Sequence, residues 1–170
     1  MIRLGLTGSI GMGKSATAHM FRDAGIPVHD SDAEVHRLYA GAAVPLIEAA
    51  FPGVVKDGVV DRTALGARVL NDSDAMKRLE SIVHPLVRQA TADFLARAEK
   101  ACHPLIVFDV PLLFEVGRHH DCDAILVVSA DPAVQRARVL ARPGMTEEKF
   151  QAILARQIPD SDKRRRAHFV

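Results

Sequence analysis

The chain has 170 residues, which is about the length of one domain. Hydrophobic residues make up 48% of it and charged residues 25%, as in a globular protein with a core, so extended disorder is excluded. The formal net charge of +1 excludes overall attraction to nucleic acid or to an anionic membrane, and the absence of Trp leaves few rings on which bases would stack. Any affinity for phosphate must therefore be local, and we expect neither a nucleic-acid nor a membrane partner.

A strand, a glycine-rich turn and a helix open the chain. Residues 2–7 are mostly apolar and end at a cluster of glycines, which predicts a buried strand followed by a sharp turn. Residues 14–24 have the apolar spacing of a helix, and Gly25 closes it. Residues 26–29 predict a second strand, with the sequence Asp-Ser-Asp at 30–32 following its carboxyl end. This order is the beginning of a βαβ unit.

Residues 33–100 show a helical pattern with several interruptions. Prolines and glycine-containing turns between residues 45 and 58, and the polar run at 71–74, divide the pattern into short helices. The clearest helix is predicted for residues 83–99, where apolar side chains recur at helical spacing. So long a segment exceeds a simple crossover between two strands, so we expect a helical insertion on an α/β core.

Two further buried strands are predicted, at residues 105–108, ending at Asp109, and at residues 124–128. Strands that are apolar on both faces and alternate with helices are typical of a parallel sheet covered by helices on both faces. The sequence therefore predicts an α/β fold with such a sheet.

The C-terminal part predicts two capped helices. Asp131 caps the first, which begins with a proline and runs to about residue 141, and Thr146 caps the second, which Pro159 ends. We interpret the basic run at 163–166 as solvated. Residues 167–170 predict the start of a strand.

The segment from Gly8 to Ser15 matches the pattern GxxxxGK[ST], after a predicted strand and at the start of a helix. Its glycines let successive backbone N–H groups turn toward anionic oxygens, and the helix dipole adds positive potential. Lys14 is expected to reach the β- and γ-phosphates of ATP, and the Ser15 hydroxyl to bind Mg²⁺. The expected nucleotide-binding residues are Gly8, Gly11, Met12, Gly13, Lys14, Ser15 and Ala16.

A phosphate loop alone does not separate a kinase from a GTPase or a motor ATPase. The chain has no NKxD base-reading motif, and its length leaves no room for the accessory modules of a motor. The favoured class is therefore a small-molecule kinase, which needs an acceptor site and an arginine-bearing lid.

Acidic residues at the ends of predicted strands are candidates for a general base and for Mg²⁺ binding. Asp32 lies where ligands of open α/β sheets bind, and its carboxylate could accept the proton of an attacking hydroxyl. Two alternatives stay open: Asp30 or Asp32 caps the following helix, or holds Mg²⁺ through water. Asp109 follows its strand as an acid that holds Mg²⁺ through water would, and a turn-stabilising role is the alternative.

Arg138 and Arg142 are four residues apart on one predicted helix, just before the Pro-Gly pair at 143–144. Guanidinium groups there could clamp phosphates as a lid closes. The alternative is a solvated basic face, which we favour for Arg136 and Arg156.

Four segments together resemble the dephospho-coenzyme A kinases, over essentially the whole chain. The segments are Gly5 to Gly11 running into Lys14 and Ser15, Asp30-Ser31-Asp32, His84-Pro85 opening the long helix, and Pro111-Leu112-Leu113-Phe114-Glu115. The resemblance implies transfer of the ATP γ-phosphate to the ribose 3′-hydroxyl of dephospho-coenzyme A. It implies a core at 1–32, 101–141 and 160–170, a helical acceptor-binding insertion at 33–100, and a lid at 142–159. A kinase for a nucleoside monophosphate or another small alcohol, and a nucleotide-binding switch without transfer, are the alternatives.

The resemblance also assigns roles to single residues. It favours Asp32 over Asp30 as the base, and it matches Arg138 and Arg142 to arginines at the base of the lid. One departure is Ala16, because relatives usually carry a second hydroxyl residue there. It further implies substrate contacts for His84, Leu112, Leu113, Phe114 and Gln157, although spacing alone makes His84 a helix-terminus residue.

The two cysteines, Cys102 and Cys122, form no CxxC motif, which indicates free thiols in a reducing compartment. The adjacent histidines at 119–120 are not spaced to converge on a metal ion, so we expect no metal site there. No long apolar run or signal peptide is evident, so we expect a cytoplasmic protein. Relatives continue beyond the position of Val170, so we expect the working enzyme to be longer than 170 residues.

Overall fold

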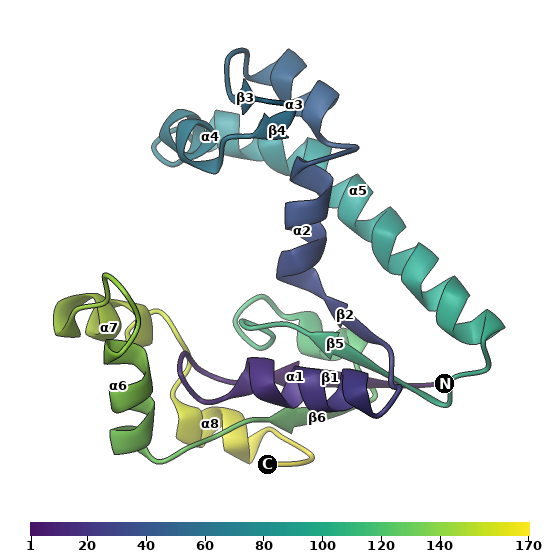
Figure 1. Ribbon diagram of the computed structural model, residues 1–170, viewed down its shortest axis with the longest axis vertical. Coiled ribbons are helices and arrows are strands. Elements are labelled where there is room, and N and C mark those ends of the chain that lie inside the picture. Colours follow the sequence, from purple (N-terminus) through teal and green to yellow (C-terminus); the bar gives the residue numbers. More distant parts are fainter. The chain divides into compact units, whose positions relative to one another are not determined.

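A four-stranded parallel sheet forms the centre of the first of two units in the computed structural model, which describes residues 1–170 (Figure 1). This unit comprises Met1–Asp30 and Ala98–Val170. The strands lie in the order β2 (Val28–Asp30), β5 (Leu105–Asp109), β1 (Ile2–Thr7) and β6 (Ala124–Val127). The predicted parallel α/β fold is confirmed.

The sheet order creates a switch point at the end of β1. The chain leaves β1, passes over the position of β5 to form β2, and later passes from β5 over β1 to form β6. The connections that leave the neighbouring strands β1 and β5 therefore run in opposite directions across the sheet. Ligands of such sheets bind outside the carboxyl ends of the strands at this point, which is where the glycine-rich loop begins.

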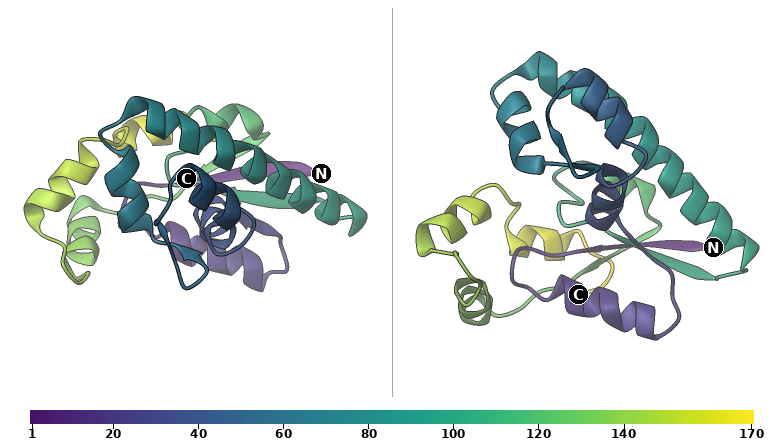
Figure 2. Two further views of the ribbon diagram at one scale, coloured as in Figure 1. Left: turned by 90° about the horizontal axis from the view of Figure 1, so that it is seen from above. Right: turned by 45° about the horizontal axis from the view of Figure 1, so that its top comes forward.

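Most helices of this unit begin where the sequence predicts. Helix α1 (Lys14–Asp23) packs on β1, β2 and β5, and its ribbon runs beside these strands in both views of Figure 2. The Asp131 carboxylate caps α6 (Pro132–Leu140) by accepting a hydrogen bond from the Ala133 N–H at 2.8 Å. The Thr146 hydroxyl caps α7 (Glu147–Leu154).

The C-terminal segment differs from the sequence prediction. Helix α7 ends at Leu154, and a further helix, α8 (Asp160–Arg165), begins directly after Pro159. This proline starts a helix because its fixed φ, here −52°, suits a helix entrance and its missing N–H is not needed there. A short 3₁₀ helix, η1 (Arg118–Asp121), precedes β6. The predicted strand start is present as a parallel bridge between Phe169 and Leu126.

The second unit comprises Ser31–Arg97 and has its own hydrophobic core. Its helices are α2 (Ser31–Tyr39), α3 (Val44–Ala50), α4 (Arg62–Val69) and most of α5 (Ser73–Lys100). Side chains of all four helices form one apolar cluster, which includes residues from the first half of α5. The core residues include Leu38, Ile47, Phe51, Leu65, Val69, Leu79 and Val83.

The structure differs from the sequence prediction at two places in this unit. The expected turn at Asp57 and Gly58 joins a small antiparallel hairpin, β3 (Val55–Lys56) and β4 (Val59–Val60), whose two-residue strands are too short to show an alternating pattern. Helix α5 begins at Ser73 and not at residue 83. The Asp72 carboxylate accepts hydrogen bonds from the Asp74 and Ala75 N–H groups and caps it.

Pro85 therefore lies inside a long helix, and His84 is not at its terminus. The proline has no N–H, so one hydrogen bond within the helix is missing at this position. None of the helices has both the length and the apolar character that a membrane span requires.

Candidate active site

The phosphate loop is shaped by contacts that exclude side chains at its glycines. A Cβ atom on Gly8 would lie 2.6 Å from the Val128 carbonyl oxygen, and one on Gly11 would lie 2.5 Å from Cγ2 of Val139. Gly11 and Gly13 have φ values of +78° and +105°, which favour glycine. Gly13 is the residue before α1, so the loop leads directly into the helix N-terminus.

Lys14 forms a partly buried ion pair with Asp109 at the carboxyl end of the sheet. Its Nζ lies 2.5 Å from Oδ1 of Asp109, whose residue is only 2% exposed. Burial raises the pKa of the Asp109 carboxyl, although Lys14 opposes the shift, and the nearby Asp30 raises it further. Asp30 is the register partner of Asp109 on the neighbouring strand and pairs with Arg22 at 3.6 Å. Two carboxylates and one lysine thus meet beside the loop.

Two glutamines hold the backbone of the loop at one residue, Ile10, by binding its carbonyl and its N–H. The side-chain amide of Gln135, on α6, donates to the Ile10 carbonyl at 2.7 Å. The Ile10 N–H in turn donates to Oε1 of Gln157 at 3.2 Å. Gln157 was expected to contact substrate, and in the structure it binds the loop. The contact of Gln135 with the loop was not predicted. The sequence signal for it is a polar residue on the apolar side of a helix.

The two predicted arginines differ in their surroundings. Nη1 of Arg138, on α6, lies 3.8 Å from the position that a Cβ on Gly13 would occupy, so its guanidinium reaches the phosphate loop. Arg142 follows the C-cap residue of α6 and is exposed. Ser15 and Ala16 are also exposed, in the first turn of α1.

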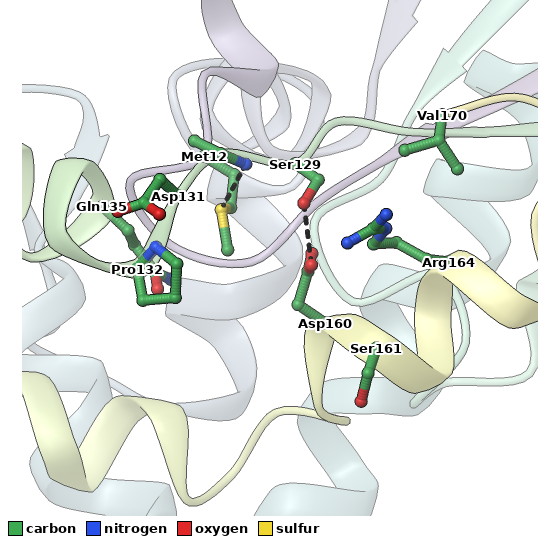
Figure 3. A pocket seen from close by; sticks show the side chains of 10 residues that line it. Met12, Ser129, Asp131, Pro132, Gln135, Asp160, Ser161, Arg164 and Val170 are labelled. Atoms are coloured by element: carbon green, nitrogen blue, oxygen red, sulfur yellow. Dashed lines mark hydrogen bonds between the residues drawn. The ribbon is translucent and has the colours of Figure 1, made fainter.

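A cavity of about 620 Å³ opens beside the loop (Figure 3). Met12 lines one side, and its Sδ accepts a hydrogen bond from the Ala130 N–H at 3.1 Å. Across the cavity, the Ser129 hydroxyl donates to Oδ2 of Asp160 at 2.7 Å, and Arg164 lies on the same wall. The cavity therefore combines an apolar thioether with charged and hydroxyl groups.

Asp32 and His84 belong to the second unit. Asp32 is the second residue of α2, in its first turn, and is exposed. His84 is exposed on α5. The catalytic role of Asp32 and the substrate contact of His84 stay predictions.

The turn after β5 contains both core and surface residues. Leu112 is 39% exposed, whereas Leu113 and Phe114 are buried. Leu113 fills the space beside Gly5, because a Cβ on Gly5 would lie 2.8 Å from its Cδ2. Of the three side chains expected to line the acceptor groove, only that of Leu112 is available at the surface.

The solvated interpretation of the basic run at 163–166 was wrong for Lys163. This side chain is 0% exposed, and its Nζ lies 2.8 Å from Oε1 of Glu115. The same Glu115 oxygen accepts a hydrogen bond from the Ile158 N–H at 3.0 Å. Burial acts to raise the pKa of the Glu115 carboxyl, but Lys163 and backbone amides outweigh it and the pKa is lowered. The pair joins α8 to the turn after β5, which Arg166 also contacts through the ring of Phe114.

Replacing Lys163 with methionine is expected to lower the free energy of unfolding by about 3 kcal/mol, because it leaves the Glu115 carboxylate buried without its cation. Urea unfolding at pH 7 measures this loss, with Arg165→Met, on the exposed side of the same helix, as the matched control. Adding Glu115→Gln should restore most of the stability.

The pair also makes stability depend on pH. Since the folded-state pKa of Glu115 is lowered, the pair stabilises the protein fully at a pH above the ordinary pKa of 4.5, and the stabilisation is lost as the pH falls through the lowered pKa. Equal losses in the Lys163 and Arg165 variants would contradict the assignment.

The strand order, the glycine-rich loop at the switch point and Lys14 at the start of the next helix define the P-loop class of nucleotide-binding proteins. The family model described as dephospho-CoA kinase matches residues 2–170. This chain belongs to the dephospho-CoA kinase family.

Individual relatives agree with this placement. The chain is 64% identical over 170 residues to a protein of Mesorhizobium japonicum named dephospho-CoA kinase, with 100% of this chain and 86% of that protein covered. A crystal structure of a Thermus thermophilus protein is similar with a TM-score of 0.84 at 38% identity, covering 99% of this chain and 86% of that one. A Campylobacter jejuni dephospho-CoA kinase, at 22% identity, shares the fold with a TM-score of 0.65 and covers 98% of this chain and 85% of its own.

Proposed function

We propose that this protein transfers the γ-phosphate of ATP to the ribose 3′-hydroxyl of dephospho-CoA, giving CoA and ADP in the final step of CoA biosynthesis. The observation that carries the proposal is the phosphate loop, with Lys14 beside Asp109, in a chain whose whole length matches this kinase family. The loop supplies the phosphate-binding groups, and the family match selects the acceptor.

On this proposal, nucleotide binding changes the partner of Lys14. The ammonium group is held by Asp109 without nucleotide and turns to the β- and γ-phosphates when ATP enters the loop. Arg138, whose guanidinium reaches the loop, and Arg142 neutralise charge on the transferring phosphoryl group.

The residues present suit Mg²⁺, which prefers oxygen ligands and retains several waters. The exposed Ser15 hydroxyl would bind the ion directly, and Asp109 would hold it through water. When bound, Mg²⁺ would neutralise negative charge on the oxygens of the β- and γ-phosphates.

We further infer that Asp32 accepts the proton of the 3′-hydroxyl. The oxygen then forms a bond to the γ-phosphorus as the bond from that phosphorus to the β–γ bridging oxygen breaks, and ADP leaves with the bond's electrons. General-base assistance of this kind accelerates transfer by about 10²- to 10⁴-fold.

The nucleoside of ATP fits the cavity beside Met12, which adjoins the phosphate loop and carries polar groups at Ser129 and Asp160. We also infer that the enzyme acts in the cytoplasm, since both of its cysteines are free thiols.

An ADP-release assay with different acceptors tests the proposal. We expect turnover with ATP and dephospho-CoA, and little turnover with AMP, with shikimate or without acceptor. Turnover with AMP but not dephospho-CoA would indicate a nucleoside monophosphate kinase, and nucleotide binding without turnover on any acceptor would indicate a switch protein.

A further inference from the structure

One face of α2 carries the proposed base and a cation bound one turn away. Asp32 and His36 are four residues apart, so they lie on the same face of the helix, separated by roughly 6 Å along its axis. Arg62, the first residue of α4, donates a hydrogen bond from Nη1 to Nε2 of His36 at 2.7 Å. Residues 32, 36 and 62 belong to the same unit, so their arrangement does not depend on the placement of the two units.

The Arg62 guanidinium is not neutralised by a carboxylate. Glu34 of α2 and Asp61, the residue before α4, have other partners: Glu34 pairs with Arg37 at 2.5 Å, and Asp61 pairs with Lys56 at 2.5 Å. Asp61 also accepts hydrogen bonds from two backbone amides at the start of α4. No ion pair of the structure includes Arg62, whose residue is exposed.

The surroundings of Arg62 fix its direction while leaving its charge available. Because a guanidinium only donates hydrogen bonds, Nε2 of His36 is the acceptor in this contact. Tyr39, one turn further along α2, is half-buried; burial raises the pKa of its hydroxyl, and the positive charge of Arg62 acts in the opposite direction. The positive charge of Arg62 is therefore held beside the face of α2 that also carries Asp32.

We propose that Arg62, oriented by His36, binds the 5′-diphosphate of the acceptor nucleotide while Asp32 faces its 3′-hydroxyl. The inference rests on the proposed function and names the acceptor contact within it. In dephospho-CoA both groups are attached to one ribose, so a base and an anion-binding cation must lie within the span of a single nucleotide. Asp32 and His36, the residue that Arg62 contacts, are one helical turn apart, which is within the span of a nucleotide. The planar fork of arginine also suits phosphate oxygens better than a lysine ammonium does.

The test compares ligands with and without the diphosphate. Arg62→Gln is expected to raise KM for dephospho-CoA by about 10- to 100-fold, the range for loss of a charge-assisted hydrogen-bonded contact, with KM for ATP unchanged. Adenosine lacks the diphosphate, so its inhibition constant against dephospho-CoA should not change. Arg68→Gln, on the same helix with its guanidinium on the Pro52 carbonyl, is the matched control and should leave every constant unchanged.

The role of His36 is tested in the same assay. His36→Ala should raise KM for dephospho-CoA by a smaller factor than Arg62→Gln, and His36→Gln, which retains an acceptor for the guanidinium, should restore most of the affinity. An unchanged KM in Arg62→Gln, or an equal loss of affinity for adenosine, would overturn the proposal. Failure of the proposed function gives a different result: the wild-type protein itself would not turn over dephospho-CoA.

Discussion

Replacing Lys14 with methionine is expected to lower kcat/KM for ATP by about 10³-fold or more. Methionine keeps much of the length of the side chain but removes the cation that would meet the β- and γ-phosphates, and one cationic side chain on a transferring phosphoryl group contributes at least this factor. Steady-state kinetics with dephospho-CoA measure the loss of turnover, and calorimetric titration of the variant with ATP measures the loss of nucleotide affinity. Activity within tenfold of the wild type would contradict the role of Lys14.

The same variant should also be less stable, because Asp109 then stays buried without its cation. Burial already raises the pKa of this carboxyl, and removal of Lys14 raises it further. At a pH well below the ordinary pKa of 3.8, the carboxyl is protonated in both the folded and unfolded states, so the loss of stability should be small in strong acid and grow as the pH rises. Urea unfolding at pH 5 and pH 8 checks the sign, and the double variant with Asp109→Asn should recover stability without recovering activity.

The second large effect is expected for Asp32→Asn. The amide cannot accept the proton of the 3′-hydroxyl, so kcat should fall by about 10²- to 10⁴-fold while the affinity for ATP stays within about twofold of the wild type. Glu34→Gln is the matched control, since it removes a carboxylate from the same turn of α2. If Asp32→Asn retains the wild-type kcat, or if Glu34→Gln loses as much, Asp32 is not the base.

Features that depend on neighbouring residues in the chain could be predicted from the sequence. The phosphate loop follows from the glycines and Lys14, which lie together between a strand and a helix. The caps of α6 and α7 follow from Asp131 and Thr146, because a capping side chain bonds to backbone only two or three residues away.

Features that depend on distant partners could not be predicted. Lys163 stands in a basic run, and only the fold brings Glu115 against it and permits its burial. The contacts of Gln135 and Gln157 with Ile10 likewise join segments far apart in the sequence. The hairpin at 55–60 was missed for a different reason, since strands of two residues are too short to show periodicity.

Phosphorus NMR of the complete reaction tests the central claim most directly. With ATP and dephospho-CoA as the only substrates, we predict one new phosphomonoester signal coupled to the ribose 3′ proton, in equal amount to the ADP formed, with the diphosphate signals of the acceptor unchanged. ADP formed without that signal, or a new phosphate attached at any other position of the acceptor, would contradict the proposed transfer to the 3′-hydroxyl.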